Sequence, residues 1–456
     1  MTGGGFSRRQ VLQLLGGAGA AAVLGPVLAG CDGGERSFAQ AGPTTNLGRG
    51  GWCWFQAPRA ALAPDDRLWL GTTVDGTGSS RDGQVEVTAF DTRTRRVVER
   101  HTLGDRRADD HTSPSVYLIG SRPQVAWAPH AREDWIDVGM VGSRLQRIHR
   151  PASLSGVGRG MSYASAHQVA GARWILYRGE EFSWNLLRST DAGRSWTAHG
   201  LVIAPNASGQ RPYMCAASDG QRLHLMATNG NPTEYRGNNV GYCSIDGNLT
   251  IRDNAGKTIG RVGSSPAPVG ALTRLFTGKP GATEQTDTDG WVCDVKIVDH
   301  HPTAILSVRD NWPSGGSNVG NWRHRYLWAR QRNGGRWTVE HLAWAGSELY
   351  KNQPDYTGLG VIDPSNPSRT VISTDVHPAT GTPLRSSADG KVHHELWEGL
   401  RTGEGKWAWT ALTANSRLDN LRPVITSNGH RKSLAWLQGT YTAWFDWSTD
   451  VLVRST

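Results

Sequence analysis

The sequence is poor in the features that build helical, zinc-binding or nucleic-acid-binding proteins. Beyond residue 30 it has no long run of apolar residues at helical spacing, which argues against a helical bundle. The five cysteines include no Cys-x-x-Cys pair, which argues against a four-cysteine zinc site. Lysine and arginine form no long run although the net charge is +9. We therefore expect no nucleic-acid partner, and an anionic polymer fits the positive charge equally well.

Glycine, proline and tryptophan are abundant instead, with 57, 22 and 20 residues. This composition suits many short strands that are joined by tight turns and packed by large rings. Short apolar or alternating runs occur at residues 67–73, 84–90, 115–119, 124–128, 173–177, 222–227, 293–298, 304–308, 326–330, 370–374 and 433–437. No shift in composition marks a second domain, so the sequence predicts one all-β domain.

The octapeptide at 189–196, Ser-Thr-Asp-Ala-Gly-Arg-Ser-Trp, fits the pattern Ser/Thr-x-Asp-x-Gly-x-x-Trp. It resembles the Asp-box, or bacterial neuraminidase repeat, a tight turn between two antiparallel strands of a propeller blade. Asp191 can accept backbone hydrogen bonds there, Gly193 can adopt a positive φ, and Trp196 can cover the blade edge. At roughly 40–60 residues per blade, the chain after residue 49 has room for about seven to ten blades. We predict a single β-propeller over residues 50–456, with seven blades.

The N-terminal region has the features of an export signal. Ser-Arg-Arg-Gln-Val-Leu at 7–12 resembles the twin-arginine motif, and Leu-Ala-Gly-Cys at 28–31 resembles a lipobox. We predict a signal peptide over 1–30, a lipidated Cys31, a flexible tether over 31–49, and a location on the cell surface, anchored to the membrane. A short membrane-spanning anchor is the alternative, but the apolar stretch is diluted by glycine and proline.

The four cysteines after Cys31 allow three disulfide pairings. They are Cys53, Cys215, Cys243 and Cys293. Cys215 and Cys243 lie in two strand-like runs separated by one loop, so a cross-strand bridge is possible. Four buried free thiols are the alternative.

Seven stretches in order together resemble one group of Asp-box propellers, the family whose characterised members include ulvan lyases. These stretches are residues 51–60, 109–114, 127–130, 211–213, 349–350, 354–358 and 419–423. The second is Asp-Asp-His-Thr-Ser-Pro and the fourth is Arg-Pro-Tyr. The resemblance spans nearly the whole chain after the tether. It implies a polysaccharide lyase that cleaves uronic-acid-containing glycans by β-elimination.

That chemistry needs a group that neutralises the uronate carboxylate, a base for the C5 proton and an acid for the leaving oxygen. Arginine suits the first task, and histidine and tyrosine suit the other two. By resemblance, His111 and His130 match the histidine pair that lines the lyase cleft, and Tyr213 lies in the region that supplies the tyrosine.

Other arginine and polar residues complete the predicted site. Where the family often has Gly-His-Pro-Arg, this chain has Gly-Asn-Pro-Thr-Glu-Tyr-Arg at 230–236. We predict Arg236 as the fourth catalytic residue. The predicted substrate-binding residues are Arg211, Asn231, Tyr356 and Arg422. The Arg422 side chain either binds the substrate carboxylate or pairs with Asp419.

Two other functions remain open from the sequence. A sialidase-like hydrolase would use a tyrosine nucleophile, with Tyr356, Glu348 and Glu395 available. A non-catalytic, glycan-binding propeller would use its positive charge and its exposed tryptophans. The sequence requires no cofactor, although a structural metal ion is possible. Adjacent strand residues point to opposite faces, so we do not expect His393 and His394 to bind one metal ion. We expect a monomer that binds an acidic polysaccharide.

Overall fold

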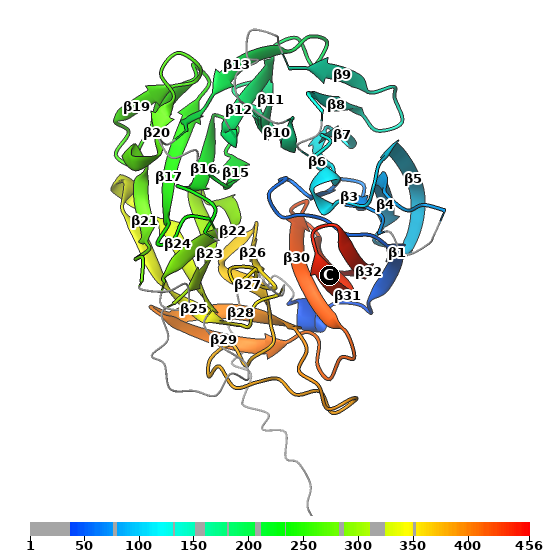
Figure 1. Ribbon diagram of the computed structural model, residues 1–456. Coiled ribbons are helices and arrows are strands. Elements are labelled where there is room, and N and C mark those ends of the chain that lie inside the picture. Colours follow the sequence, from blue (N-terminus) through cyan, green and yellow to red (C-terminus); the bar gives the residue numbers. More distant parts are fainter. Residues whose placement is uncertain are drawn as a thin grey trace, which may run out of the picture. The chain divides into compact units, whose positions relative to one another are not determined.

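Seven antiparallel sheets are arranged in a ring in the computed structural model (Figure 1). The structure describes residues 37–75, 80–130, 133–150, 160–179, 182–205, 211–232, 234–281, 287–310, 324–349 and 353–456. Residues 37–456 form one compact unit. The predicted signal peptide and Cys31 lie outside the described residues. The prediction of an all-β, seven-bladed propeller is confirmed.

Blades one to three follow each other along the chain, each with four strands. Blade one contains β2 (Ala60–Leu62), β3 (Arg67–Thr73), β4 (Gln84–Asp91) and β5 (Arg96–Asp105). Blade two contains β6 (Ser115–Ile119), β7 (Arg122–Trp127), β8 (Trp135–Met140) and β9 (Gln146–His149). Blade three contains β10 (Ser162–Val169), β11 (Ala172–Arg178), β12 (Trp184–Ser189) and β13 (Thr197–Leu201).

Blade four is larger, and blades five and six return to four strands. Blade four contains β15 (Met214–Ser218), β16 (Arg222–Thr228), β17 (Asn239–Asp246), β18 (Thr250–Arg252), β19 (Thr258–Arg261) and β21 (Thr273–Thr277). Blade five contains β22 (Asp289–Val298), β23 (His301–Arg309), β24 (His324–Gln331) and β25 (Trp337–Gly346). Blade six contains β26 (Gly360–Asp363), β27 (Asn366–Thr374), β28 (Glu395–Gly403) and β29 (Lys406–Ala411).

Blade seven combines the two ends of the folded unit. It contains β30 (Asp419–Ser427), β31 (Lys432–Ala443), β32 (Asp446–Ser455) and the N-terminal strand β1 (Thr45–Arg49). The parallel pair β14 (Ile203–Ala204) and β20 (Ala267–Pro268), and the short 3-10 turns η1 (Phe38–Gln40), η2 (Asp110–Thr112), η5 (Val269–Ala271) and η7 (Asn333–Gly335), complete the elements.

The predicted tether over 31–49 is wrong in its second half. Although residues 37–49 are rich in small and polar residues, β1 pairs antiparallel with β32 and closes blade seven. Leu47 is buried in that sheet, and Phe38 is fully buried with its backbone N–H donating to Glu398 at 3.2 Å. Hydrogen bonds and two apolar side chains therefore make this segment part of the propeller.

The innermost strands of the blades form the wall around the axis of the ring. Each contacts the next, from β2 through β6, β10, β15, β22, β26 and β30 and back to β2. A cavity of about 460 Å³ lies among them and is lined mainly by small and apolar residues such as Val116, Ala166 and Ala216. The segment that precedes each innermost strand therefore opens on the same mouth of the ring.

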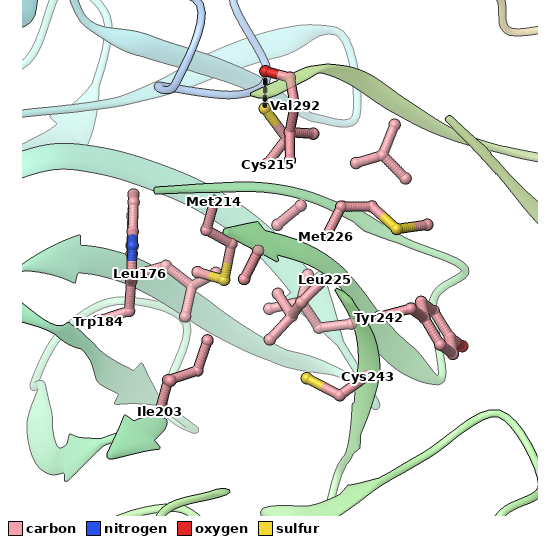
Figure 2. Packing of buried hydrophobic residues seen from close by; sticks show 14 of the residues in the cluster. Leu176, Trp184, Ile203, Met214, Cys215, Leu225, Met226, Tyr242, Cys243 and Val292 are labelled. Carbon is pink, nitrogen blue, oxygen red and sulfur yellow. Dashed lines mark hydrogen bonds between the residues drawn. The ribbon is translucent and has the colours of Figure 1, made fainter. Parts of the chain in front are cut away.

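Apolar side chains fill the spaces between the sheets (Figure 2). The largest cluster joins blades three, four and five and includes the fully buried Trp174 and Trp184. Fully burying a large apolar side chain contributes about 1.5–3 kcal/mol. Stability of this kind comes from sheet-on-sheet packing, as the abundance of tryptophan predicts.

The four cysteines described by the structure are all buried free thiols. Cys215 lies on β15 and Cys243 on β17, and β16 runs between these strands. Figure 2 shows the two side chains apart, with Leu225 and Met226 between them. Strands two places apart in a sheet are about 9–10 Å from each other, too far for a disulfide. The structure thus selects the free-thiol alternative.

The predicted Asp-box turn joins β12 to β13. The Asp191 carboxylate accepts the Ser195 backbone N–H at 2.9 Å and the hydroxyl of Ser189 at 2.8 Å. Gly193 has φ of 85°, and Trp196 packs on the apolar cluster between blades two and three. These hydrogen bonds lower the pKa of Asp191. The turn therefore has the geometry that its sequence predicts.

No helix within the described ranges is long and apolar enough to span a membrane.

Candidate active site

The candidate active site lies where the innermost strands of neighbouring blades begin. His111 is in η2, directly before β6, and His130 follows β7 of the same blade. Tyr163 is the second residue of β10, and Tyr213 directly precedes β15. The start of an innermost strand and the end of its antiparallel neighbour lie at the same mouth, so these side chains converge there.

His111 and His130 form a stacked pair on one carboxylate. Their ring centroids are 3.9 Å apart, with an interplanar angle of 9°. The two Nδ1 atoms lie 2.9 Å from different oxygens of Asp109. The Trp444 ring meets both imidazoles edge-on, with centroid distances of 5.3 and 5.1 Å. Hydrogen bonds at Nδ1 fix both ring orientations and leave the Nε2 atoms for a ligand.

The two histidines have opposite protonation states near neutral pH. Burial disfavours charge on His111, but the carboxylates of Asp110 and Asp109 raise the pKa of His111 well above its ordinary value. Burial and the positive His111 lower the pKa of His130 to about 4. His111 is therefore an imidazolium and His130 is neutral. Paired groups whose pKa values are pushed apart supply a charge and a base within one site.

Arg422 and Tyr441 hold Asp110 from blade seven. Nη1 of Arg422 lies 2.7 Å from Asp110 Oδ2 and also donates to the carbonyl of Trp52. The Tyr441 hydroxyl donates to the same carboxylate oxygen at 2.5 Å. Oδ1 of Asp110 lies 2.8 Å from Nδ1 of His111. Despite burial, the charges of His111 and Arg422 keep the pKa of Asp110 far below its ordinary value.

The structure corrects both predictions for Arg422. Its side chain is 1 % exposed and is bound to Asp110, so it does not reach a substrate. Asp419 is not its partner, because Asp419 lies 3.5 and 3.7 Å from His393 and His394. Arg422 has φ of 51° within β30, an unfavourable conformation for a non-glycine residue. It is a positioning residue that acts on His111 through Asp110.

Tyr163 and Arg178 complete the site, and sequence reasoning missed both. The Arg178 guanidinium carbon lies 4.5 Å from the Tyr163 ring centroid and 4.9 Å from that of Tyr213. Burial raises the pKa of Tyr163 well above its ordinary value, so its phenol stays protonated. In the part of the chain that the structure describes, its hydroxyl and Nη1 of Arg178 are buried without a hydrogen-bond partner. These two atoms are therefore not committed to another described side chain.

Two predicted tyrosines lie beside this cluster. The Tyr213 ring packs on Tyr163 with a centroid distance of 5.9 Å and also contacts Phe55 at 4.8 Å. Tyr356 meets Trp54 and Trp291 at 5.3 and 5.4 Å. Both rings thus form part of the aromatic wall around Arg178. The phenol that stands against the histidines is that of Tyr163, whose ring centroid is 5.1 Å from His111.

The predicted residues of the 211–236 segment are engaged elsewhere. Arg236 forms an ion pair of 2.6 Å with Asp287. Arg211 lies 3.5 Å from Glu234 and its guanidinium stacks over Phe182 at 5.0 Å. The Asn231 carbonyl accepts the backbone N–H groups of Glu234 and Tyr235, which closes a local turn. The guanidinium beside the tyrosines is that of Arg178, whereas Arg236, predicted as a catalytic residue, is paired with Asp287.

A metal ion could be held by Asp109, His111 and His130, whose ligand atoms lie within 4.8 Å of one another. Cys53, Asp110 and His111 form a second group with the same spacing. Nδ1 of each histidine already shares a proton with Asp109, so an ion bound there would displace both hydrogen bonds.

His393 and His394 precede β28, and both approach Asp419. Because neither histidine lies within a strand, the rule that successive strand residues point to opposite faces does not apply to them.

Solved structures of polysaccharide lyases share this fold. Two are structures of a PL25 ulvan lyase, one of them bound to -[GlcA(1-4)Rha3S]-. Each superposes with a TM-score of 0.58 at 10% identity, over 89% of this chain and 93% or 94% of the lyase. Polysaccharide lyase Uly1 superposes with a TM-score of 0.50 at 10% identity, over 91% of this chain and 99% of Uly1. At this identity the likeness establishes the fold.

Comparison by sequence gives no further assignment. No protein-family model matches the chain, and no curated protein matches it either. The comparisons therefore establish the β-propeller fold of this chain.

Proposed function

We propose that this protein is a polysaccharide lyase that cleaves uronic-acid-containing glycans by β-elimination. The observation that carries the proposal is the stacked histidine pair, one ring charged and one neutral, which faces a protonated tyrosine and a buried arginine. The GlcA unit bound by the PL25 lyase is a sugar of the class that this chemistry requires.

Arg178 is the residue that we assign to the substrate carboxylate. A uronate C5 proton becomes acidic enough for removal only when the adjacent carboxylate is neutralised. The planar guanidinium can bind both carboxylate oxygens. Among the described residues no carboxylate lies within ion-pair distance of Arg178, so the substrate supplies the missing anion. The positive charge of His111 adds to that of Arg178 as negative charge develops on the carboxylate.

His130 and Tyr163 then perform the proton transfers. Nδ1 of His130 is committed to Asp109, so the lone pair of Nε2 accepts the C5 proton. Tyr163 donates its phenolic proton to the O4 atom as the C4–O bond breaks. A C4–C5 double bond forms in the sugar, and proton exchange with solvent restores both side chains. Each transfer by a positioned group typically contributes about 10²–10⁴-fold.

A glycosidase mechanism fits the site less well. The common form of that mechanism, without the tyrosine nucleophile of sialidases, needs a carboxylic acid with a raised pKa next to a second carboxylate. Burial would raise the pKa of Asp109, but hydrogen bonds from His111 and His130 lower it overall, and the pKa of Asp110 is lowered too. Glu395 of blade six accepts hydrogen bonds from Ser416, in the loop before β30, and from Asn420 of blade seven. Neither carboxylate at the histidine pair can serve as the acid.

An ultraviolet assay tests the proposal directly. Incubation with uronate polysaccharides, ulvan included, is expected to raise absorbance at about 235 nm as the unsaturated product accumulates. Release of reducing ends without this absorbance would point to hydrolysis and contradict the proposal. Binding of the same polymers by the folded protein without any turnover would instead identify a non-catalytic propeller.

The pH profile of the reaction follows from the histidine pair. We expect kcat/KM to rise as pH increases through about 4, where His130 of the substrate-free enzyme loses its proton. It is expected to fall only well above pH 6.5, where His111 becomes neutral. Initial rates measured from pH 3.5 to about 10 check this bell shape. A profile governed by a single group near pH 6.5 would contradict opposite protonation states.

We also propose that the chain is exported by the twin-arginine pathway and anchored to the membrane through a lipid on Cys31. The motifs at 7–12 and 28–31 support this proposal. Metabolic labelling with a radioactive fatty acid is expected to mark the full chain and to leave Cys31→Ala unlabelled. Equal labelling of both would contradict it.

A further inference from the structure

Tyr163 has a strained backbone that the rest of the fold has to hold in place. Its φ is 55°, in the left-handed region that bulky residues rarely adopt. The pairing of β10 with β11 is irregular at this point, and two residues of β10, Tyr163 and Ala164, stand opposite one residue of β11, Tyr177. Bulges redirect side chains, and strained residues persist only where their surroundings fix them. The neighbours of Tyr163 therefore decide where its phenol points.

One neighbour is the linker over residues 50–59, which joins β1 of blade seven to β2 of blade one. This linker also contacts blades that it does not connect. The Trp54 indole N–H donates to the Val292 carbonyl of blade five at 3.1 Å. The side-chain amide of Gln56 donates to the carbonyl of His111, directly before blade two. The linker thus reaches across the ring and lies against the segment that carries the first histidine.

Phe55 and Ala57 of this linker hold the bulge of β10. The Ser165 hydroxyl donates to the Phe55 carbonyl at 3.1 Å and accepts the backbone N–H of Ala57 at 3.2 Å. Ser165 is the residue at which β10 resumes its pairing with β11. The buried Phe55 ring meets the Tyr163 ring edge-on at a centroid distance of 5.7 Å and contacts Tyr213 at 4.8 Å. The linker therefore supports both the backbone beside Tyr163 and one side of its ring.

We propose that Phe55 and Ser165 are positioning residues, which hold Tyr163 in its strained conformation and so aim its phenol at the leaving oxygen of the substrate. Without them, the Tyr163 backbone relaxes toward a negative φ, and the ring moves from its place beside His111. The proposal rests on the proposed function, because Tyr163 is the proton donor there. It makes the linker between β1 and β2 a working part of the active site.

Phe55→Leu tests the ring contact, with Phe38→Leu as the matched control. Both phenylalanines are buried, but Phe38 packs between blades six and seven. Phe55→Leu is expected to lower kcat by about 10²-fold, the cost of a misplacement of about 1 Å, and to leave KM nearly unchanged. Phe38→Leu is expected to retain the kcat of the wild type. Equal kcat values for the two variants would overturn the proposal.

Ser165→Ala removes both linker hydrogen bonds and leaves the apolar packing intact, so it provides the test if Phe55→Leu does not fold. It is expected to lower kcat by about tenfold or more. Ser433→Ala is its control, because the Ser433 hydroxyl is equally buried and bonds Ser455 within blade seven. A kcat for Ser165→Ala that matches its control would contradict the positioning role.

A double-mutant cycle separates positioning of Tyr163 from a general loss of structure. In the Tyr163→Phe background, Phe55→Leu is expected to lower kcat no further, because no phenol remains to be misplaced. A second loss of the same size would show that Phe55 acts through the fold or through another residue, and the proposal would be wrong.

A crystal structure of the Phe55→Leu protein gives a readout that needs no turnover. Tyr163 is expected to show a negative φ and a displaced ring, and an unchanged φ near 55° would overturn the positioning role. A displaced Tyr163, together with wild-type protein that cleaves no uronate polymer, would support the positioning and contradict the proposed function. Turnover by the wild type, with Tyr163 unmoved in the variant, would do the reverse.

Discussion

Tyr163→Phe is expected to lower kcat by about 10²–10⁴-fold and to leave the protein as stable as the wild type. The substitution removes the proposed proton donor and retains the ring that packs against His111. The hydroxyl has no hydrogen-bond partner in the described structure, so its loss leaves no buried group unpaired. Steady-state kinetics by the absorbance assay and thermal unfolding would measure the two effects.

Tyr117→Phe is the control for this variant. Tyr117 lies on β6 and also has a buried hydroxyl without a partner among the residues described. It packs between blades two and three, away from the imidazoles. We expect its kcat to match that of the wild type. Full activity of Tyr163→Phe would exclude Tyr163 as the acid.

Arg422→Met is expected to lower the free energy of unfolding by about 3–5 kcal/mol, because it leaves Asp110 charged, buried and without its arginine. Urea denaturation would measure the loss. The control is Arg67→Met, whose ion pair with Glu99 is about 40% exposed, with 42% for Arg67 and 38% for Glu99. Pairs of that kind contribute at most about 1 kcal/mol.

The Asp110→Asn variant distinguishes this mechanism from simple loss of packing. In the Arg422→Met background, Asp110→Asn removes the unpaired charge, so it is expected to cost less stability than it does in the wild type. Equal costs in both backgrounds would show that Arg422 stabilises the fold by packing alone.

Much of the fold could be predicted from the sequence, because local residue patterns specify many of the strands and turns. The runs at 67–73 and 115–119 coincide with β3 and β6, and the octapeptide at 189–196 forms the hydrogen-bonded turn that it predicts. The N-terminal strand β1 was missed for the opposite reason. Its small and polar residues carry no alternating pattern, and only pairing with β32, some 400 residues away in sequence, makes them a strand.

Only part of the candidate site could be predicted from the sequence, for a related reason. His111 and His130 were predicted because they belong to stretches with a recognisable residue order. Tyr163 and Arg178 lie in ordinary strands, where tyrosine and arginine usually pack or face solvent, and only the ring brings them to the histidines. Their positions at the start of β10 and the end of β11 are the signal that could have found them, since both places open on the same mouth as His111.

The strand β1 has a further consequence for how the ring can open. All other blades are held in sequence by the covalent chain, whereas β1 and β32 are joined only by hydrogen bonds and side-chain contacts. A pulling force on the N-terminal segment, or a protease that cuts within it, would peel β1 away and leave β32 as an unpaired edge that can recruit another chain. The same sheet carries Arg422 and Tyr441, which hold the Asp110 carboxylate beside His111. The pairing of β1 with β32 therefore also supports the positive charge on His111.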